Sequence, residues 1–215
     1  MILALHAGVL VDRHRRSVLS GAVDVWTTPT LEGRIVRLEP LELRHLDDLW
    51  EASRDPAVWA WLPIVQPSDR DELRAWLDEA LASTHLPFAT ISLASGKAIG
   101  STRFLAQRPE HRSVEIGWTW LARDAWGTGA NTEAKLLQLA HAFETWDCRR
   151  VELKTDALNV RSRAAIEALG ARFEGIHEKH MLVRDGQNRD SAWYAILDDD
   201  WPTTRALLEA RLPGS

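Results

Sequence analysis

A short segment with two glycines, Trp126-Gly-Thr-Gly129, separates a strand-like stretch from an amphipathic, helix-like stretch. Residues 114–121 form the first stretch, and residues 129–145 carry apolar side chains at helical spacing. The first N–H groups of a helix have no partner within the helix, and the helix dipole favours negative charge there. Glycines let the backbone approach a ligand closely. We therefore expect an anion site at this turn, with a pyrophosphate as its natural guest.

A glycine turn of this kind occurs in several structural settings, and each has to be weighed against an anion site. A Gly-x-Gly segment before a helix is a weak signal alone, because an ordinary tight turn uses the same residues. A P-loop would end in Gly-Lys-Ser or Gly-Lys-Thr, which is absent here. A dinucleotide-binding fingerprint needs a third glycine near the start of a βαβ unit, which fits poorly. An anion site and a plain turn both remain open at this point.

The order of patterns along the chain predicts one α+β (mixed α/β) domain around a single sheet. The chain shows a strand, two helices, several strands, and then a helix–strand–helix–strand series. Ser95-Gly96 and Asp185-Gly186 are turn signals between neighbouring strands. Residues 1–28 read as an N-terminal extension, with a strand-like stretch at 23–26, and residues 29–215 read as the domain.

Two further expectations concern the faces of individual elements. Ser68 is expected to cap the second helix, because it precedes a run of acidic residues that suits a helix start. The buried face of that helix is expected to hold Leu73, Trp76, Leu77 and Leu81. Strict alternation in the strand at 114–121 would put four side chains on one face: Val114, Ile116, Trp118 and Trp120.

Composition excludes several functional classes. The net charge of −5 argues against a nucleic-acid binder, which would normally show a basic face. No apolar run reaches the roughly 18 residues that a membrane span needs, and no secretory leader is expected at the N-terminus. The single cysteine, Cys148, rules out an intramolecular disulfide and suits a reducing cytoplasm. His and carboxylate residues show no metal-type spacing.

Three blocks of sequence follow one another in the chain. The first is Trp126-Gly-Thr-Gly129 with Glu133-Ala134 soon after it. The second is Asn159-Val-Arg-Ser162 followed by Leu169-Gly-Ala-Arg-Phe-Glu-Gly175. The third consists of Asp185-Gly186, Arg189-Asp190, Tyr194 and Trp201. In this order they resemble motif A and two later blocks of the GNAT superfamily of N-acetyltransferases, particularly the branch of ribosomal-protein N-acetyltransferases. The resemblance covers roughly residues 31–202.

The resemblance implies a central, mostly antiparallel twisted sheet with a splayed strand pair, flanked by helices. It implies acetyl-CoA as co-substrate and no metal, with the pantetheine arm between the strands at 114–121 and 150–155. The residues it places at the cofactor are Trp120, Leu121, Trp126, Gly127, Thr128, Gly129, Ala130, Asn131, Thr132, Asn159 and Ser162. The family's general motif has Gln or Arg where Trp126 stands, so one polar group near the pyrophosphate is expected to be missing.

Catalytic candidates also follow from the resemblance. Glu115 is the first candidate for the general base, acting directly or through a water, and His180 and Glu178 are lesser candidates. In the ribosomal-protein branch a serine at the position of Ser162 is proposed to protonate the departing thiolate. A structural alternative makes Asn159 a helix N-cap with Ser162 in the first turn.

The predicted function is acetyl-CoA-dependent transfer of an acetyl group to a primary amine, of a protein N-terminus or a small molecule, by direct attack. A catalytically idle acyl-CoA-binding module is the alternative, because Ile166 stands where many relatives have a tyrosine acid. A patch of Trp59, Trp61 and Pro63 either covers the acceptor or packs two helices together. We expect a cytoplasmic monomer or homodimer, with no nucleic-acid or membrane partner.

Overall fold

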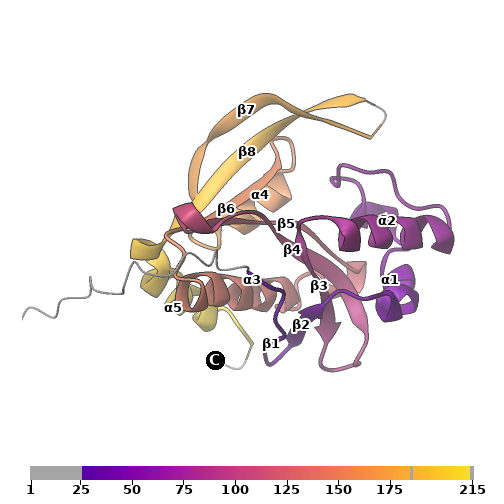
Figure 1. The fold of residues 1–215 in the computed structure, drawn as a ribbon, viewed down its shortest axis with the longest axis horizontal. Coiled ribbons are helices and arrows are strands. Elements are labelled where there is room, and N and C mark those ends of the chain that lie inside the picture. The colour runs from indigo at the N-terminus through magenta and orange to yellow at the C-terminus, as the bar shows by residue number, and fades with distance from the viewer. Residues whose placement is uncertain (1–25, 185, 214–215) are drawn as a thin grey trace, which may run out of the picture.

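A computed structural model describes residues 26–184 and 186–213, which form one mixed sheet with helices on both faces (Figure 1). The strands are β1 (Leu31–Glu32), β2 (Val36–Pro40), β3 (Leu86–Ser92), β4 (Ala98–Arg108), β5 (Ser113–Leu121), β6 (Arg150–Asp156), β7 (Arg172–Val183) and β8 (Gln187–Leu197). The helices are α1 (Leu46–Ala52), α2 (Arg70–Ala82), α3 (Ala130–Ala140), α4 (Val160–Glu167) and α5 (Trp201–Ala210). The α+β prediction is confirmed.

The sheet has the order β1-β2-β3-β4-β5-β6-β8-β7. Every neighbouring pair is antiparallel except β5 and β6, which run parallel in the middle of the sheet. The crossover from β5 to β6 contains α3, as a parallel connection requires. The β7–β8 hairpin extends well beyond the rest of the sheet (Figure 1).

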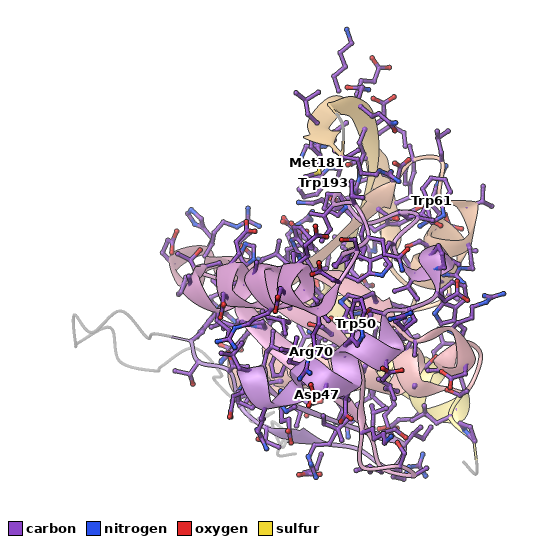
Figure 2. All side chains as sticks on the ribbon, turned by 90° about the vertical axis from the view of Figure 1, so that its right-hand side faces the viewer. Asp47, Trp50, Trp61, Arg70, Met181 and Trp193 are labelled. Atoms are coloured by element: carbon purple, nitrogen blue, oxygen red, sulfur yellow. The ribbon has the colours of Figure 1, made fainter. Side chains whose placement is uncertain are left out.

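Two hydrophobic clusters fill the two faces of the sheet. On one face α1 and α2 pack through Leu49, Leu73 and Leu77. On the other face α3 and α5 pack through Leu139 and Leu208. The pair Asp47–Arg70 joins α1 to α2 at the surface (Figure 2).

Glu133 fixes the start of α3 against the sheet. Its buried carboxylate accepts three backbone N–H groups at the entrance to β2, from Arg34 at 2.8 Å, Ile35 at 2.6 Å and Val36 at 2.7 Å. Charge-assisted hydrogen bonds of this kind are short and strong. The Glu-Ala pair of the first sequence block therefore holds the glycine turn in a fixed position relative to the sheet.

The strand at 114–121 does not alternate strictly, and that prediction is wrong. Gly117 pairs with Arg103 and Trp120 with Ser101, so two residues of β5, Trp118 and Thr119, lie opposite the single Thr102 of β4. This arrangement is a β-bulge, which changes the faces of the residues that follow it. Trp118 has a φ of +51°, which is rare for a bulky residue.

The bulge divides the side chains of β5 between the two cores. Val114 and Ile116 pack with α3 and α5, whereas Trp118 and Trp120 pack with α1 and α2. Leu121 returns to the first group. The side chains of Trp118 and Trp120 therefore lie on the opposite face from the one that simple alternation predicts.

Three smaller expectations about helices also need correction. The N-cap of α2 is Asp69, not Ser68, because the Asp69 carboxylate accepts the Glu72 amide at 2.9 Å. Ala80 takes the buried position expected for Leu81, which is 40% exposed. The predicted helix at 129–145 is α3 followed by a π-helical turn, His141–Thr145.

Residues 1–25 and Asp185 lie outside the described residues, and with them most of the predicted N-terminal extension and part of the second hairpin turn. At the end of the predicted extension, Trp26 stacks on Trp146 with ring centroids 4.5 Å apart. The division of the chain at residue 28 stays a prediction. None of the helices in the described residues is both long and apolar enough to cross a membrane.

Candidate active site

The candidate site is a gap between β5 and β6. The two strands pair from Ser113 and Arg150 only as far as Ile116 and Leu153, and their pairing stops just before the bulge. A cavity of about 550 Å³ follows β5 from Glu115 along this gap to the glycine turn. That volume lies within the usual range for small-molecule sites.

The two glycines of the turn have different roles. Gly127 lines the cavity with φ at +78°, and a Cβ atom there would meet nothing within 4 Å. Gly129 is the N-cap of α3 with φ at +91°, and a Cβ there would lie 3.1 Å from Ile35 and Pro213. Gly127 therefore leaves space that faces the cavity, whereas Gly129 allows close packing. Of the predicted turn residues, Trp126, Gly127 and Asn131 line the cavity, and Thr128, Gly129, Ala130 and Thr132 do not.

Two arginines surround Trp126 at this end of the cavity. The Arg161 guanidinium lies 3.4 Å from the centre of the indole ring, and that of Arg123 lies 4.2 Å from it. The indole N–H donates to the Leu121 carbonyl at 2.9 Å, which fixes the ring. Trp126 itself carries no charge, but Arg123 and Arg161 bring positive charge to the turn from other segments.

Glu115 lies at the other end of the gap, where β5 and β6 still pair. It is 2% exposed, lines the cavity, and its Oε2 lies 2.9 Å from Lys154 Nζ on β6. Burial raises the pKa of the Glu115 carboxyl, and the Lys154 ammonium opposes part of that rise. A carboxylate with a raised pKa is a stronger base toward an ammonium than an exposed one.

Asn159 and Ser162 lie on the opposite wall, at the start of α4. The Asn159 side chain caps this helix, since its Oδ1 accepts the Ser162 amide at 3.0 Å. The expected role of Asn159 as a helix N-cap is confirmed. The cap uses only the backbone amide of Ser162, not its hydroxyl, and both residues line the cavity. Ile166 also lines the cavity, and the single tyrosine of the chain, Tyr194, is held by Arg163 and Glu167.

Comparison with known proteins places this geometry in a family. The family model of the acetyltransferase (GNAT) domain matches residues 36–172. The chain belongs to the GNAT acetyltransferase family. Among its described residues, no group of three or more His, Cys, Asp or Glu could hold a metal ion.

Three GNAT relatives illustrate the range of similarity. YdaF of Bacillus subtilis (strain 168), provisionally named a ribosomal N-acetyltransferase, is 32% identical over 91 residues, 42% of this chain and 49% of that protein. The chain thus matches about half the length of this curated relative. A GCN5-related N-acetyltransferase from Brucella melitensis is 37% identical with a TM-score of 0.83, over 88% of this chain and 90% of that one. RimJ of Mycobacterium smegmatis, solved with CoA-disulfide, shares the fold at 24% identity and a TM-score of 0.71, over 86% and 95% of the two chains.

Sequence reasoning missed Lys135, a residue of the GNAT site that is buried behind the bulge. Its Nζ lies 2.6 Å from Thr119 Oγ1, 3.0 Å from Thr102 Oγ1 and 3.1 Å from Gln138 Oε1. Burial lowers the pKa of this ammonium to about 7. Lys135 thus connects α3 to both strands at the bulge. Helical spacing alone placed it on α3 without indicating that it faces a cavity.

The end of the cavity near Glu115 also contains residues that sequence reasoning did not assign to it. His85 and Arg189 line it, from the segment before β3 and from β8. The lesser base candidates do not: His180 is bonded to Ser191 on the hairpin, and Glu178 is exposed. No local motif marks His85. Arg189 belongs to the third sequence block, but that block does not indicate that its side chain reaches the cavity, because only the packing of separate strands brings it there.

The aromatic patch divides between the two roles expected of it. Trp59 is buried against Trp76 and Trp120 and donates its indole N–H to the Ser53 carbonyl, so it packs the helices. Trp61 and Pro63 line the cavity instead. Figure 2 shows Trp61 across from the hairpin that carries Met181 and Trp193.

The shifted pKa of Lys135 predicts a pH-dependent stability. Between about 7 and the usual 10.5 the unfolded lysine binds a proton that the folded protein does not, so stability rises with pH in this window. Lys135→Met removes this dependence. From pH 7 to pH 10 the unfolding free energy of wild type should therefore rise relative to that of Lys135→Met. The rise should be about 1.4 kcal/mol per pH unit and reach a few kcal/mol.

Urea unfolding at several pH values measures this difference. Lys97→Met, at the exposed turn between β3 and β4, is the matched control and should show no such trend. Parallel stability curves for wild type and Lys135→Met would show that Lys135 keeps an ordinary pKa.

Proposed function

We propose that this protein is an acetyl-CoA-dependent N-acetyltransferase that transfers the acetyl group to a primary amine by direct attack. The observation that carries the proposal is the single cavity that joins the glycine turn, through the β5–β6 gap, to the buried Glu115. Membership of the GNAT family supports the same reaction class. A cytoplasmic location suits the single buried Cys148.

The residues at the turn fit the anionic end of acetyl-CoA. The N-terminus of α3 offers backbone N–H groups, and Arg123 and Arg161 add positive charge beside Trp126. Gly127 leaves space for a phosphate to approach the backbone. The gap beyond the bulge suits a narrow pantetheine arm, and Asn159 and Ser162 stand on its far wall. Bound acetyl-CoA supplies an activated thioester carbonyl.

Glu115 serves as the proton acceptor in this proposal. Direct attack requires a neutral amine, and as the new N–C bond forms and the C–S bond breaks, the nitrogen loses its proton. The Glu115 carboxylate takes that proton, directly or through a water. Burial raises the pKa of Glu115, and the Lys154 ammonium at 2.9 Å opposes that rise by stabilising the carboxylate.

Ser162 serves as the proton donor to the departing thiolate, and its hydroxyl regains a proton from solvent while Glu115 releases the proton taken from the amine. The Ser162 amide donates to the Asn159 side chain, which fixes the start of the helix. Ser162 itself lines the cavity. The structure offers no tyrosine for this task, since Ile166 occupies the corresponding helix position and Tyr194 is bound to other residues. The acceptor amine belongs to a protein N-terminus or a small molecule; YdaF, by its name, supports the former.

The cofactor site is tested by calorimetric titration of acetyl-CoA into the wild type and Gly127→Ala. The added methyl group enters the cavity, so we expect the dissociation constant to rise at least about tenfold, or roughly 1.4 kcal/mol. Gly96→Ala is the control, because Gly96 has a similar φ of +70° and open space, but lies at the β3–β4 turn. Equal affinities in the two variants would remove the turn from the cofactor site.

The catalytic assignment is tested by Glu115→Gln and Ser162→Ala. We expect kcat to fall by roughly 100-fold or more in Glu115→Gln, the usual range for general-base removal, and less in Ser162→Ala. The dissociation constant of acetyl-CoA should stay within a few-fold of wild type in both. Thiol release from acetyl-CoA with a panel of amines gives the rates. An idle acyl-CoA-binding module would bind acetyl-CoA and show no amine-dependent thiol release from the start.

A further inference from the structure

Arg189 is a buried cation that the proposed reaction does not use. It lies on β8, is 8% exposed, and lines the cavity. Its side chain forms no hydrogen bond and no ion pair with any residue in the described part of the chain, and its Nε is fully buried. Arginine stays protonated in proteins, so this side chain carries a fixed charge with five unused donors.

An unpaired buried guanidinium is uncommon, because burying a charge without a partner is costly. The nearest carboxylates already have partners: Glu115 is paired with Lys154, and Asp156 Oδ1 accepts the Leu158 amide. Burial lowers the pKa of Arg189 and the nearby Arg184 adds to this, whereas Asp156 and Glu115 oppose the shift through space without contacting Arg189. The missing partner of Arg189 is therefore expected to come from outside the chain.

The charged side chains around the cavity form two groups, one at the glycine turn and one near Glu115. At the turn, Arg161 faces the end assigned to the cofactor phosphates. At the end near Glu115, Glu115 and Lys154 offset each other, and Asp156 acts on Arg189 through space without contact, so the Arg189 guanidinium is the cation there without a hydrogen-bonding partner in the described residues. The walls beside it are apolar, with Met181 on the hairpin and Trp61 across from it (Figure 2). An anionic group that enters this end finds a guanidinium in a low-dielectric setting, where such a pair is strong.

We propose that the acceptor is a primary amine that also carries a carboxylate, and that Arg189 binds the carboxylate while Glu115 faces the amine. This inference rests on the proposed N-acetyltransferase function and narrows its substrate class. Because Glu115 and Arg189 act on the same end of one cavity, the amine and the carboxylate must lie only a few bonds apart. A free amino acid satisfies this, and so does a peptide whose first residue is Asp or Glu.

Matched pairs of amines test the inference. Each free amino acid is compared with its carboxamide, and peptides beginning with Asp or Glu with those beginning with Asn or Gln. Rates of thiol release from acetyl-CoA are expressed per concentration of unprotonated amine, because amidation lowers the pKa of the neighbouring amine. For wild type we expect kcat/KM to favour the carboxylate member by roughly 10- to 100-fold, the usual effect of a charged hydrogen bond. The free amino acids and the peptides distinguish the two sources of the carboxylate.

The ratio of interest is kcat/KM for the carboxylate member divided by kcat/KM for its neutral partner. In Arg189→Gln this ratio should fall to near one, mainly through a higher KM for the carboxylate member. Arg189→Lys should keep part of the preference. Arg74→Gln, on the exposed face of α2, is the matched control and should keep the full ratio. A ratio near one in wild type, or one that survives in Arg189→Gln, overturns the inference. Should no amine in the panel react, calorimetry of the same pairs with CoA-saturated protein decides, and absent binding of every carboxylate also overturns it.

The proposed function fails in a different way. If acetyl-CoA does not bind to the wild-type protein, the N-acetyltransferase proposal fails and the inference fails with it. If acetyl-CoA binds and neutral amines react as fast as carboxylates, only the inference about Arg189 fails.

Discussion

Pairing between β5 and β6 ends after Ile116 and Leu153, and the rest of the site depends on that early end. The bulge that follows the last β5–β6 pair is held from both faces of the sheet. On one face the Arg103 guanidinium lies between the rings of Trp76 and Trp118, at 4.8 and 4.7 Å from their centres. On the other face Lys135 bonds to the threonines of the bulge. A bulky residue at positive φ is strained, so such a conformation persists only when its surroundings fix it.

The charged side chains of the site lie in different parts of the cavity that the gap opens. Buried groups interact strongly because little water screens them, so each charged side chain acts mainly on what occupies its own part of the cavity. Arg123 and Arg161 surround the turn, the Glu115–Lys154 pair lies where the strands still meet, and Arg189 lines the same cavity. In the function we propose, the cavity binds the cofactor's anionic groups at the turn, and it holds the base and an anion-binding cation at its other end.

The features that could be predicted from sequence are local ones. The glycine turn, the amphipathic α3, and Glu115 on the strand before them each follow from neighbouring residues, and they lie where expected. The bulge could not be predicted, because it depends on contacts from β4 and α3 that no period in β5 reveals. Arg161 and Arg189 stand in the sequence blocks that resemble the family, but their place at the cavity was missed for a similar reason, since α4 and β8 reach the cavity only through the tertiary fold. Even the cap of α2 shifted by one residue, because Asp69 and Ser68 are equally plausible until the backbone is seen.

Amide hydrogen exchange with and without acetyl-CoA tests most directly whether the gap is the cofactor site. We predict slower exchange on binding in two segments, 118–121 at the end of β5 and 127–132 at the start of α3. Residues 113–116, which are already paired with β6, should change little. Saturating acetyl-CoA that leaves both segments unchanged, or protects only segments away from the cavity, would contradict the account.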